Sequence, residues 1–389
     1  MDPREFEATV VLGLTPGIGS ATLRRVYEHF GSAAEALAAL VRLTSGGRRP
    51  PPDADGRSLV SGAIDARQLD AGRRAAEEAI AWRSGEDRHL LVAHGPGYPP
   101  ALAAAEGAPP VLFVRGRADV LQGALVAVVG ARRASHYGRD VARWFGAALA
   151  DAGLPVVSGL ALGVDGAAHE AALGVGGTTV AVFGTGIDRV YPPRHADLAR
   201  RITNSGCLVS EFPLGTAARR AHFPRRNRVI AGLTRAVVVV EARARSGSLI
   251  TARLAADAGR EVFAVPGAVF SDQAVGCHAL IRDGATLAAT PEDVLEAFSA
   301  GEIKCRRPQP AGDAAPAGPD EAAVREALGA EAVSFDALLE RTGLTPATLS
   351  SILTTLEMQG SVALEPEGRY RRRRGSPHTG TTPAEDRHR

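Results

Sequence analysis

This sequence of 389 residues contains little lysine, no closely spaced pair of cysteines and no long apolar run. Lys304 is the only lysine among 45 basic residues, so nearly every cation is a guanidinium. The planar donor fork of arginine suits phosphate, although codon use in a GC-rich genome explains the same bias. Cys207, Cys277 and Cys305 form no CxxC pair, so we expect neither a disulfide framework nor a metal site.

No stretch approaches the roughly 18 apolar residues of a membrane span, and the N-terminal residues are charged, unlike a signal peptide. We therefore expect no membrane association and a location in the reducing cytoplasm. Net charge of one sign is also scarce, since 45 basic and 43 acidic residues leave +2. Any affinity for a polyanion must come from local clusters of charge.

The chain is long enough for two or three domains. Residues 1–82 are mainly helical in pattern, interrupted by a Gly- and Pro-rich loop at 46–53. From 83 to 299, alanine-rich helical segments alternate with short β-branched runs at 125–129, 155–158, 178–183, 207–210, 236–240 and 261–265. Apolar strands that alternate with helices predict an α/β domain with a doubly wound parallel sheet, buried on both faces.

A second domain is predicted beyond a linker. Residues 300–319 are rich in Ala, Gly and Pro and show no periodicity, as expected of a flexible linker. Three short helical patterns and a polar hairpin follow within 320–370, which is typical of a winged-helix domain. The last residues, 371–389, are expected to form a disordered basic tail.

The loops after the predicted strands carry most of the chemical signal, because ligands of open α/β sheets bind at the carboxyl ends of the strands. At 130–135, glycine and arginines precede a helix, which predicts either a phosphate cradle or a tight turn with solvated arginines. At 158–166, we interpret Asp165 as a helix cap, because Asp165 and His169 alone make a poor metal site. Ser-Gly-Ser at 246–248 predicts an anion nest, a simple N-cap, or both.

The strongest signal is a basic cluster. Residues 212–240 contain no acidic residue and six arginines: Arg219, Arg220, Arg225, Arg226, Arg228 and Arg235. Within this run, Phe-Pro-Arg-Arg-Asn-Arg at 223–228 places arginines over the first turn of a predicted helix, where they oppose the helix macrodipole. A polyanion at that helix start would remove the penalty, whereas a solvated basic face does not explain it.

A glycine hairpin near the N-terminus allows two interpretations. Pro-Gly-Ile-Gly at 16–19 lies between two helical patterns. Such a turn either points backbone amides at a nucleic-acid phosphate, as in a helix-hairpin-helix, or is a packing turn in a small helical bundle. The sequence alone leaves both open.

Taken in order, the motifs resemble the DprA/Smf family of DNA-processing proteins over about residues 13–370. The matching segments are Val-Gly-Ala-Arg at 129–132, Ser-Gly at 158–159, Gly-Val-Asp at 163–165, Gly-Ile-Asp at 186–188, Tyr-Pro at 191–192, Ser-Glu-Phe-Pro at 210–213, the segment 223–228 and Val-Pro-Gly at 265–267. The resemblance implies an extended Rossmann-like core that binds single-stranded DNA without sequence preference and forms a homodimer. It also implies protection of incoming DNA, loading of the recombinase RecA during natural transformation, an N-terminal sterile-alpha-motif or helix-hairpin-helix domain, and a C-terminal winged helix.

Site residues follow from the resemblance and the loop signals together. Arg132 corresponds to the phosphate-binding arginine of the family, with Ala131 in place of the usual serine. The residues expected at single-stranded DNA are Gly130, Arg132, Ser158, Gly159, Gly163, Phe223, Arg225, Arg226, Asn227, Arg228, Ser246, Gly247 and Ser248. The family dimerises through the region that contains Leu280, Ile281 and Leu287. His278 replaces an asparagine of the family, so we expect either a pH-sensitive anion pocket or the loss of a minor contact.

Two other functions would use features of the same sequence. A nucleotide phosphoribohydrolase of the lysine-decarboxylase-like type would use Glu211 or Glu241, but its Pro-Gly-Gly-x-Gly-Thr loop is replaced by Ser-Gly-Ser at 246–248. A winged-helix transcription regulator would need cations on the helix at 345–359, which has none. We therefore predict a DNA-binding protein with no catalytic residue, metal or cofactor, whose partners are single-stranded DNA, RecA and a second copy of the chain.

Overall fold

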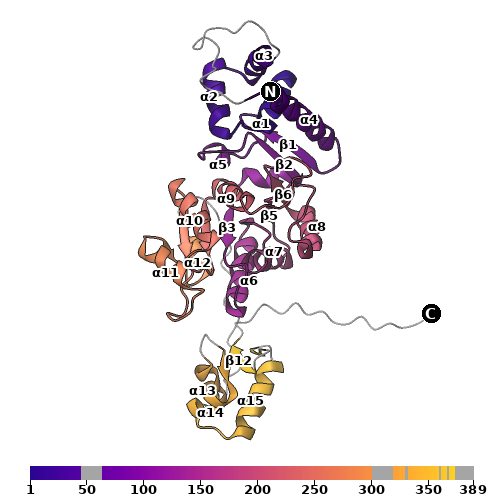
Figure 1. The fold of residues 1–389 in the computed structure, drawn as a ribbon. Helices are drawn as coiled ribbons and strands as arrows, with labels where there is room; N and C mark the ends of the chain where they lie inside the picture. The colour runs from indigo at the N-terminus through magenta and orange to yellow at the C-terminus, as the bar shows by residue number, and fades with distance from the viewer. Residues whose placement is uncertain (45–63, 300–318, 329–331, 359–360, 366–367, 373–389) are drawn as a thin grey trace, which may run out of the picture. The chain divides into compact units, whose positions relative to one another are not determined.

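The computed structural model describes residues 1–44, 64–299, 319–328, 332–358, 361–365 and 368–372 (Figure 1). By their contacts, the residues divide into two compact units, Met1–Cys305 and Arg306–Arg389, and each is described by itself. The predicted linker lies outside the described residues except for its last position, Pro319. No helix within the described ranges is long and apolar enough to cross a membrane.

A nine-stranded sheet forms the centre of the first unit, in the order β1-β2-β6-β5-β4-β3-β7-β8-β9. The strands are β1 (Arg88–Val92), β2 (Val111–Gly116), β3 (Val126–Val129), β4 (Val156–Ser158), β5 (Thr179–Val182), β6 (Cys207–Ser210), β7 (Ala236–Val239), β8 (Glu261–Ala264) and β9 (Thr286–Leu287). All neighbours from β6 to β9 pair in parallel, whereas β2 pairs antiparallel with both β1 and β6. The chain winds outward from β3 in both directions, so the carboxyl ends of β3 and β7 meet at a topological switch point.

Helices cover both faces of this sheet. Those of the first unit beyond β1 are α5 (Pro100–Ala103), α6 (His136–Asp151), α7 (Val164–Gly174), α8 (Ala196–Ser205), α9 (His222–Leu233), α10 (Gly247–Asp257), α11 (Val275–Arg282) and α12 (Pro291–Ser299), with 3₁₀ turns η1 (Ala118–Gln122) and η2 (Pro193–His195). Residues of α9 and α10 pack in one core with alternate residues of the strands, while α6, α7 and α12 pack in another. The predicted doubly wound α/β architecture is confirmed.

The N-terminal helices are α1 (Pro3–Leu14), α2 (Ser20–Phe30), α3 (Ala33–Thr44) and α4 (Ala66–Arg83). Helices α1 and α4 pack against β1 and β2, and α2 and α3 pack against α1. Val10 and Leu69 share a core with Phe113 and Leu208 of the sheet, so these helices belong to the first unit. The predicted domain boundary at residue 82 therefore crosses a shared core and stays a prediction.

The N-terminal hairpin lies against α4, with Pro16, Gly17 and Gly19 exposed. Gln68 of α4 donates from Nε2 to the carbonyl oxygen of Pro16 at 3.2 Å. A methyl group at Gly72 of α4 would overlap the Thr15 hydroxyl, which shows how closely α4 approaches the turn. These contacts fit a packing turn, and the exposed residues of the turn fit a DNA-binding hairpin, so both interpretations stay predictions.

The second unit, drawn in yellow in Figure 1, has the winged-helix arrangement that was predicted. Its elements are α13 (Pro319–Ala327), β10 (Val333–Ser334), α14 (Phe335–Thr342), α15 (Pro346–Met358), β11 (Val362–Leu364) and β12 (Arg369–Arg372), with strand order β10-β12-β11. Leu338, Leu349 and Leu356 are among its core residues. Arg371 is buried and its Nε donates to Glu365 at 2.9 Å, so the wing extends two residues into the predicted tail. The remaining tail lies outside the described residues.

Candidate nucleic-acid interface

The loops after β3, β4 and β7 meet at the carboxyl edge of the sheet. Val164 donates its backbone N–H to the carbonyl of Ala131 at 3.3 Å, which joins the β4 loop to the β3 loop. Gly163 has φ +84°, and a side chain there would overlap the Ala131 carbonyl, so glycine is required at this crossing. The predicted gathering of these loops is therefore present.

Glu241 joins the β7 loop to the start of α6. Its carboxylate accepts the backbone N–H of Ser135 at 3.0 Å and the Ser135 hydroxyl at 2.6 Å. The Ser135 hydroxyl in turn accepts the N–H of Gly138 at 2.9 Å and caps α6. The N-terminus of α6, expected to cradle a phosphate, is thus already occupied by a buried carboxylate of the protein.

Arg132 is exposed and stacks on an aromatic ring from another segment. Its guanidinium carbon lies 4.7 Å from the ring centroid of Phe223, the second residue of α9. Stacking on a ring leaves the in-plane N–H donors of an arginine free for an anion. Burial lowers the pKa of the Arg226 guanidinium, and the charge of Arg132 lowers it further.

Arg226 points into the protein. Only 4% of the residue is exposed, and Nη1 donates to the carbonyl of Gly159 at 2.8 Å and to that of Val182. Burial lowers the pKa of Arg226 to about 10, while the Asp165 carboxylate opposes this shift, so the guanidinium stays charged at neutral pH. This placement differs from the expected phosphate contact: Arg226 bridges the ends of β4 and β5 from beneath.

Arg225 and Arg228 share one carboxylate. The buried Glu211 is paired with Arg228, and its Oε2 lies 3.4 Å from Nε of Arg225. Burial raises the pKa of Glu211, although both arginines act to lower it. Arg228 also donates to the carbonyl of Gly107 and is half-buried. Part of the predicted positive charge is therefore neutralised, whereas the side chain of Arg225 remains 59% exposed.

Other predicted site residues support the loops from below. The hydroxyl of Ser158, fully buried, donates to the carbonyl of Val128 at 2.7 Å, and Gly159 donates its N–H to Asp165 at 3.1 Å. Asp165 thus holds the preceding loop, while the N-cap of α7 is Gly163, which corrects the predicted capping role. Asn227 is buried and donates from Nδ2 to the carbonyl of Gly247 at 3.1 Å.

The Ser-Gly-Ser segment begins α10 as predicted for an N-cap. The hydroxyl of Ser246 accepts the N–H of Ser248 at 3.3 Å and lies 2.7 Å from the Ser248 hydroxyl. Ser248 is buried, whereas Gly247 is exposed. Of the predicted set, the residues with exposed or partly exposed positions at the edge are Gly130, Arg132, Gly163, Phe223, Arg225, Arg228, Ser246 and Gly247.

His169 is a structural residue. It is fully buried, and Nδ1 lies 2.7 Å from the hydroxyl of Thr179. Burial, with smaller effects of His195 and Arg226, lowers the pKa of His169 to about 3, so the ring is neutral at physiological pH. Among the described residues, no group of three His, Cys, Asp or Glu side chains could hold a metal ion.

Exposed groups that were not named as site residues also lie on this edge. Arg133 follows β3, Arg243 and Arg245 follow β7, and Tyr191 follows β5. Tyr191 belongs to the Tyr-Pro motif at 191–192, but nothing in the sequence indicates a chemical role for its ring. Phe223, which it contacts in the fold, is distant in sequence. The pair could only be found from the fold.

His278 and the expected dimer residues lie around α11 and β9. His278 Nε2 is 3.0 Å from the carbonyl oxygen of Gly267, so this side chain holds the loop after β8. A cavity of about 430 Å³ is lined by Pro266, Val275, His278, Ile281, Arg282 and Leu287. Leu287 is 47% exposed, and Leu280 and Ile281 are partly buried. Dimerisation there stays a prediction.

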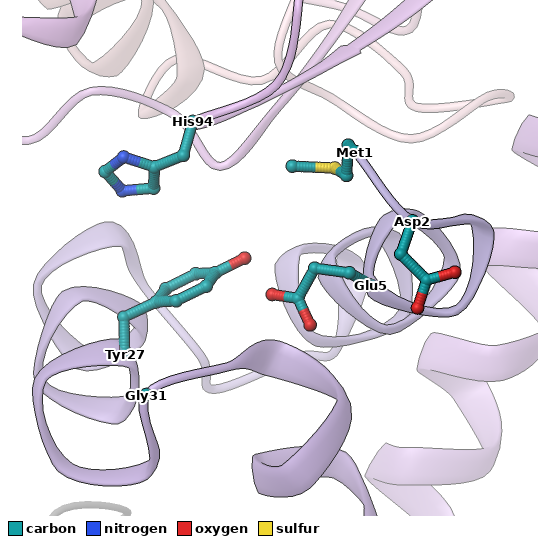
Figure 2. Close-up of a pocket in the computed structure, with 6 residues that line it drawn as sticks. All are labelled: Met1, Asp2, Glu5, Tyr27, Gly31 and His94. Atoms are coloured by element: carbon teal, nitrogen blue, oxygen red, sulfur yellow. The ribbon is translucent and has the colours of Figure 1, made fainter.

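A separate cavity of about 500 Å³ lies among the N-terminal helices, lined by Met1, Asp2, Glu5, Tyr27, Gly31 and His94 (Figure 2). Its polar groups are used within the protein. The Glu5 carboxylate accepts the backbone N–H groups of Ala33 and Ala34 at 2.8 and 3.0 Å, and Tyr27 Oη lies 2.6 Å from the Thr9 hydroxyl. This arrangement fixes the start of α3.

Comparison with known proteins agrees with this architecture. Residues 89–299 match the family model described as DNA recombination-mediator protein A, and residues 308–368 match the DprA winged helix domain. Protein Smf of Escherichia coli is 41% identical over 317 residues, which cover 79% of this chain and 84% of that protein.

Two solved structures are also similar. The X-ray structure of DprA from Streptococcus pneumoniae has a TM-score of 0.61 and 33% identity, covering 76% of this chain and 98% of that one. The structure of DprA from Helicobacter pylori, described for its single-stranded DNA binding mode, has a TM-score of 0.50 and 26% identity, covering 56% of this chain and 98% of that one. With its sheet domain and its winged helix both matched, the chain belongs to the DprA/Smf family of DNA-processing proteins.

Proposed function

We propose that this protein binds single-stranded DNA without sequence preference across the carboxyl edge of its sheet. The observation that carries the proposal is the exposed Arg132 guanidinium, held on the Phe223 ring. The guanidinium of Arg225, also exposed, lies 5.4 Å from the ring centroid of Phe212. The binding named for the Helicobacter pylori relative supports the same ligand. Arg219 and Arg220, both exposed in the segment before α9, extend the basic surface.

The mechanism is electrostatic. Arginines at the edge contact successive phosphates, while Arg226, Glu241 and Asp165 keep the loops in place from below. Phosphate contacts position a strand without reading its sequence. With about 3–5 phosphates neutralised per protomer, the logarithm of affinity falls with the logarithm of salt concentration at a slope of roughly −2 to −3.5.

The two carboxylates of the enzymatic alternative are committed to structural contacts. Both oxygens of Glu241 bind Ser135, and Glu211 is paired with Arg225 and Arg228. A carboxylate held in this way is poorly placed to act on a substrate. We infer that the protein is not a nucleotide hydrolase, and release of base from a nucleoside monophosphate would contradict this.

A role as a duplex-binding regulator is also disfavoured. The exposed hydroxyls of Thr354 and Thr355 on α15 donate to the carbonyls of Ser350 and Ser351 in the preceding turn at 2.9 and 3.0 Å. Glu357 adds a negative charge to the exposed residues of this helix. A recognition helix that contacts duplex DNA needs donors for phosphates and base edges.

The broader role follows from the family. We propose that the protein acts in the cytoplasm as a homodimer that protects incoming DNA and loads RecA during transformation. The exposed Leu287 and the cavity beside it on α11 support the dimer surface.

A mobility-shift titration with single-stranded and duplex oligonucleotides of equal length tests the proposed ligand. We expect tighter binding of the single strand at every salt concentration, and release of both as salt rises. A preference for the duplex would restore the regulator interpretation, and salt-independent affinity would refute the electrostatic mechanism.

A further inference from the structure

Tyr191 completes an aromatic group at the edge of the sheet. It lies in the loop between β5 and η2, and its ring centroid is 5.6 Å from that of Phe223, with the planes inclined at 45°. Tyr191 is 47% exposed. Phe223 therefore contacts both Arg132 and Tyr191, and Tyr191 is exposed to solvent.

Phe223 has less free surface than Tyr191. The Arg132 guanidinium covers one face of the phenylalanine ring. A methyl group at Gly184 would come within 3.1 Å of Phe223 Cδ1, so the β5 loop lies directly against the ring. Phe223 is only partly exposed as a result. Tyr191 therefore offers the most exposed ring of the group.

The loop that carries Tyr191 is anchored on both sides. Before it, the Thr185 hydroxyl donates to the carbonyl of Arg189 at 2.5 Å. After it, Nδ1 of His195 lies 2.9 Å from the carbonyl oxygen of Leu160, in the loop after β4. A ring held in this way loses little conformational entropy when a flat ligand stacks on it.

We propose that Tyr191 stacks on a nucleobase of the bound strand while Arg132 holds a neighbouring phosphate. The inference rests on the proposed function and identifies the nucleobase as the part of the DNA that Tyr191 binds. Every base has a π-face, so stacking adds affinity without selecting a sequence. Proteins that bind single strands without sequence preference combine basic side chains for the backbone with aromatic rings on which bases stack.

The test separates bases from phosphates with two oligonucleotides of equal length and charge, oligothymidylate and an abasic deoxyribose phosphate strand. We expect Tyr191→Ala to bind oligothymidylate about 5- to 150-fold more weakly than the wild type. On the abasic strand, the two proteins should bind alike, since no base is present to stack. Their salt slopes should also agree, because no phosphate contact is lost.

Tyr191→Phe is the matched control, because it keeps the ring and removes only the hydroxyl group, and it should bind both strands as the wild type does. Tyr191→Leu retains apolar bulk without the ring and repeats the test should the alanine variant fail to fold. The inference is overturned if Tyr191→Ala or Tyr191→Leu binds oligothymidylate with the affinity of the wild type. It is also overturned if the variant loses affinity equally for oligothymidylate and for the abasic strand. Failure of the wild type to bind either strand contradicts the proposed function instead, so the two failures are distinguishable.

Discussion

Replacing Arg226 by alanine should destabilise the sheet unit, because this arginine is part of its interior. The wild-type guanidinium donates to the carbonyls of Gly159 and Val182 and, from Nε, to Oδ1 of Asn227 at 3.2 Å. Removing it leaves these acceptors and the buried Asp165 carboxylate without their cation. A buried acceptor left unsatisfied costs about 1–3 kcal/mol, so losing the donor to these two carbonyls alone should cost about 2–6 kcal/mol.

The expected loss is large enough for a thermal melt. For a large domain, 1 kcal/mol shifts the melting temperature by about 2–4 °C, so a loss of about 2–6 kcal/mol should make Arg226→Ala melt roughly 4–24 °C below the wild type. Circular dichroism or calorimetry at neutral pH measures the shift. Arg226→Lys should recover only part of it, because a single ammonium cannot reproduce the fork that spans two carbonyls.

Arg225→Ala is the matched control, since it removes the same charge from the adjacent residue. Its side chain is 59% exposed and its contact with Glu211 is long, 3.4 Å from Nε to Oε2, so stability should change little. Affinity for single-stranded DNA should fall instead. The reasoning is refuted if Arg226→Ala melts with the wild type but binds DNA with a shallower salt slope, which is the signature of a lost phosphate contact.

Three further outcomes are expected. Lowering the pH from 6.5 to about 4.5 should reduce the unfolding free energy of the wild type by about 2–3 kcal/mol through His169. The reason is that the His169 ring takes up a proton near pH 6.5 in the unfolded chain but only near about 3 in the folded protein. Urea titrations should show that His169→Gln lacks this part of the pH dependence. Gly159→Ala should lower the melting temperature because its methyl would overlap the Arg226 guanidinium, whereas Gly247→Ala, with open space around it, should not. Leu287→Asp should shift sedimentation towards the monomer, and an unchanged sedimentation coefficient would place the dimer surface elsewhere.

The sheet was predictable because its strands are continuous apolar runs bounded by helical segments. Val126–Val129 and Ala236–Val239 are buried throughout, as parallel strands covered on both faces must be. The winged helix followed from equally local patterns. The wing's extension to Arg372 was missed, because a run of arginines has no periodicity that distinguishes a strand from a tail.

The sequence analysis did not foresee that Arg226 points into the protein. Adjacent residues on a helix point about 100° apart, so Arg225 and Arg226 cannot face the same side. Arg226 lies one turn before Val229 and Ile230, which are buried, and this spacing could have placed it on the inner face of α9. The contact of Glu241 with Ser135 joins residues 106 positions apart and left no comparable signal.

The salt dependence of DNA binding by Arg132→Ala tests the central claim most directly. The control is Arg117→Ala, which removes an exposed arginine at the opposite edge of the sheet. The backbone N–H of Arg117 donates to the carbonyl of Gly206 at 2.9 Å, and Gly206 lies just before the start of β6. Loss of one charge-assisted phosphate contact should weaken Arg132→Ala about 10- to 150-fold and make its salt slope less negative by about 0.7, while Arg117→Ala keeps both wild-type values. Equal affinities and equal slopes for the two variants would contradict the account.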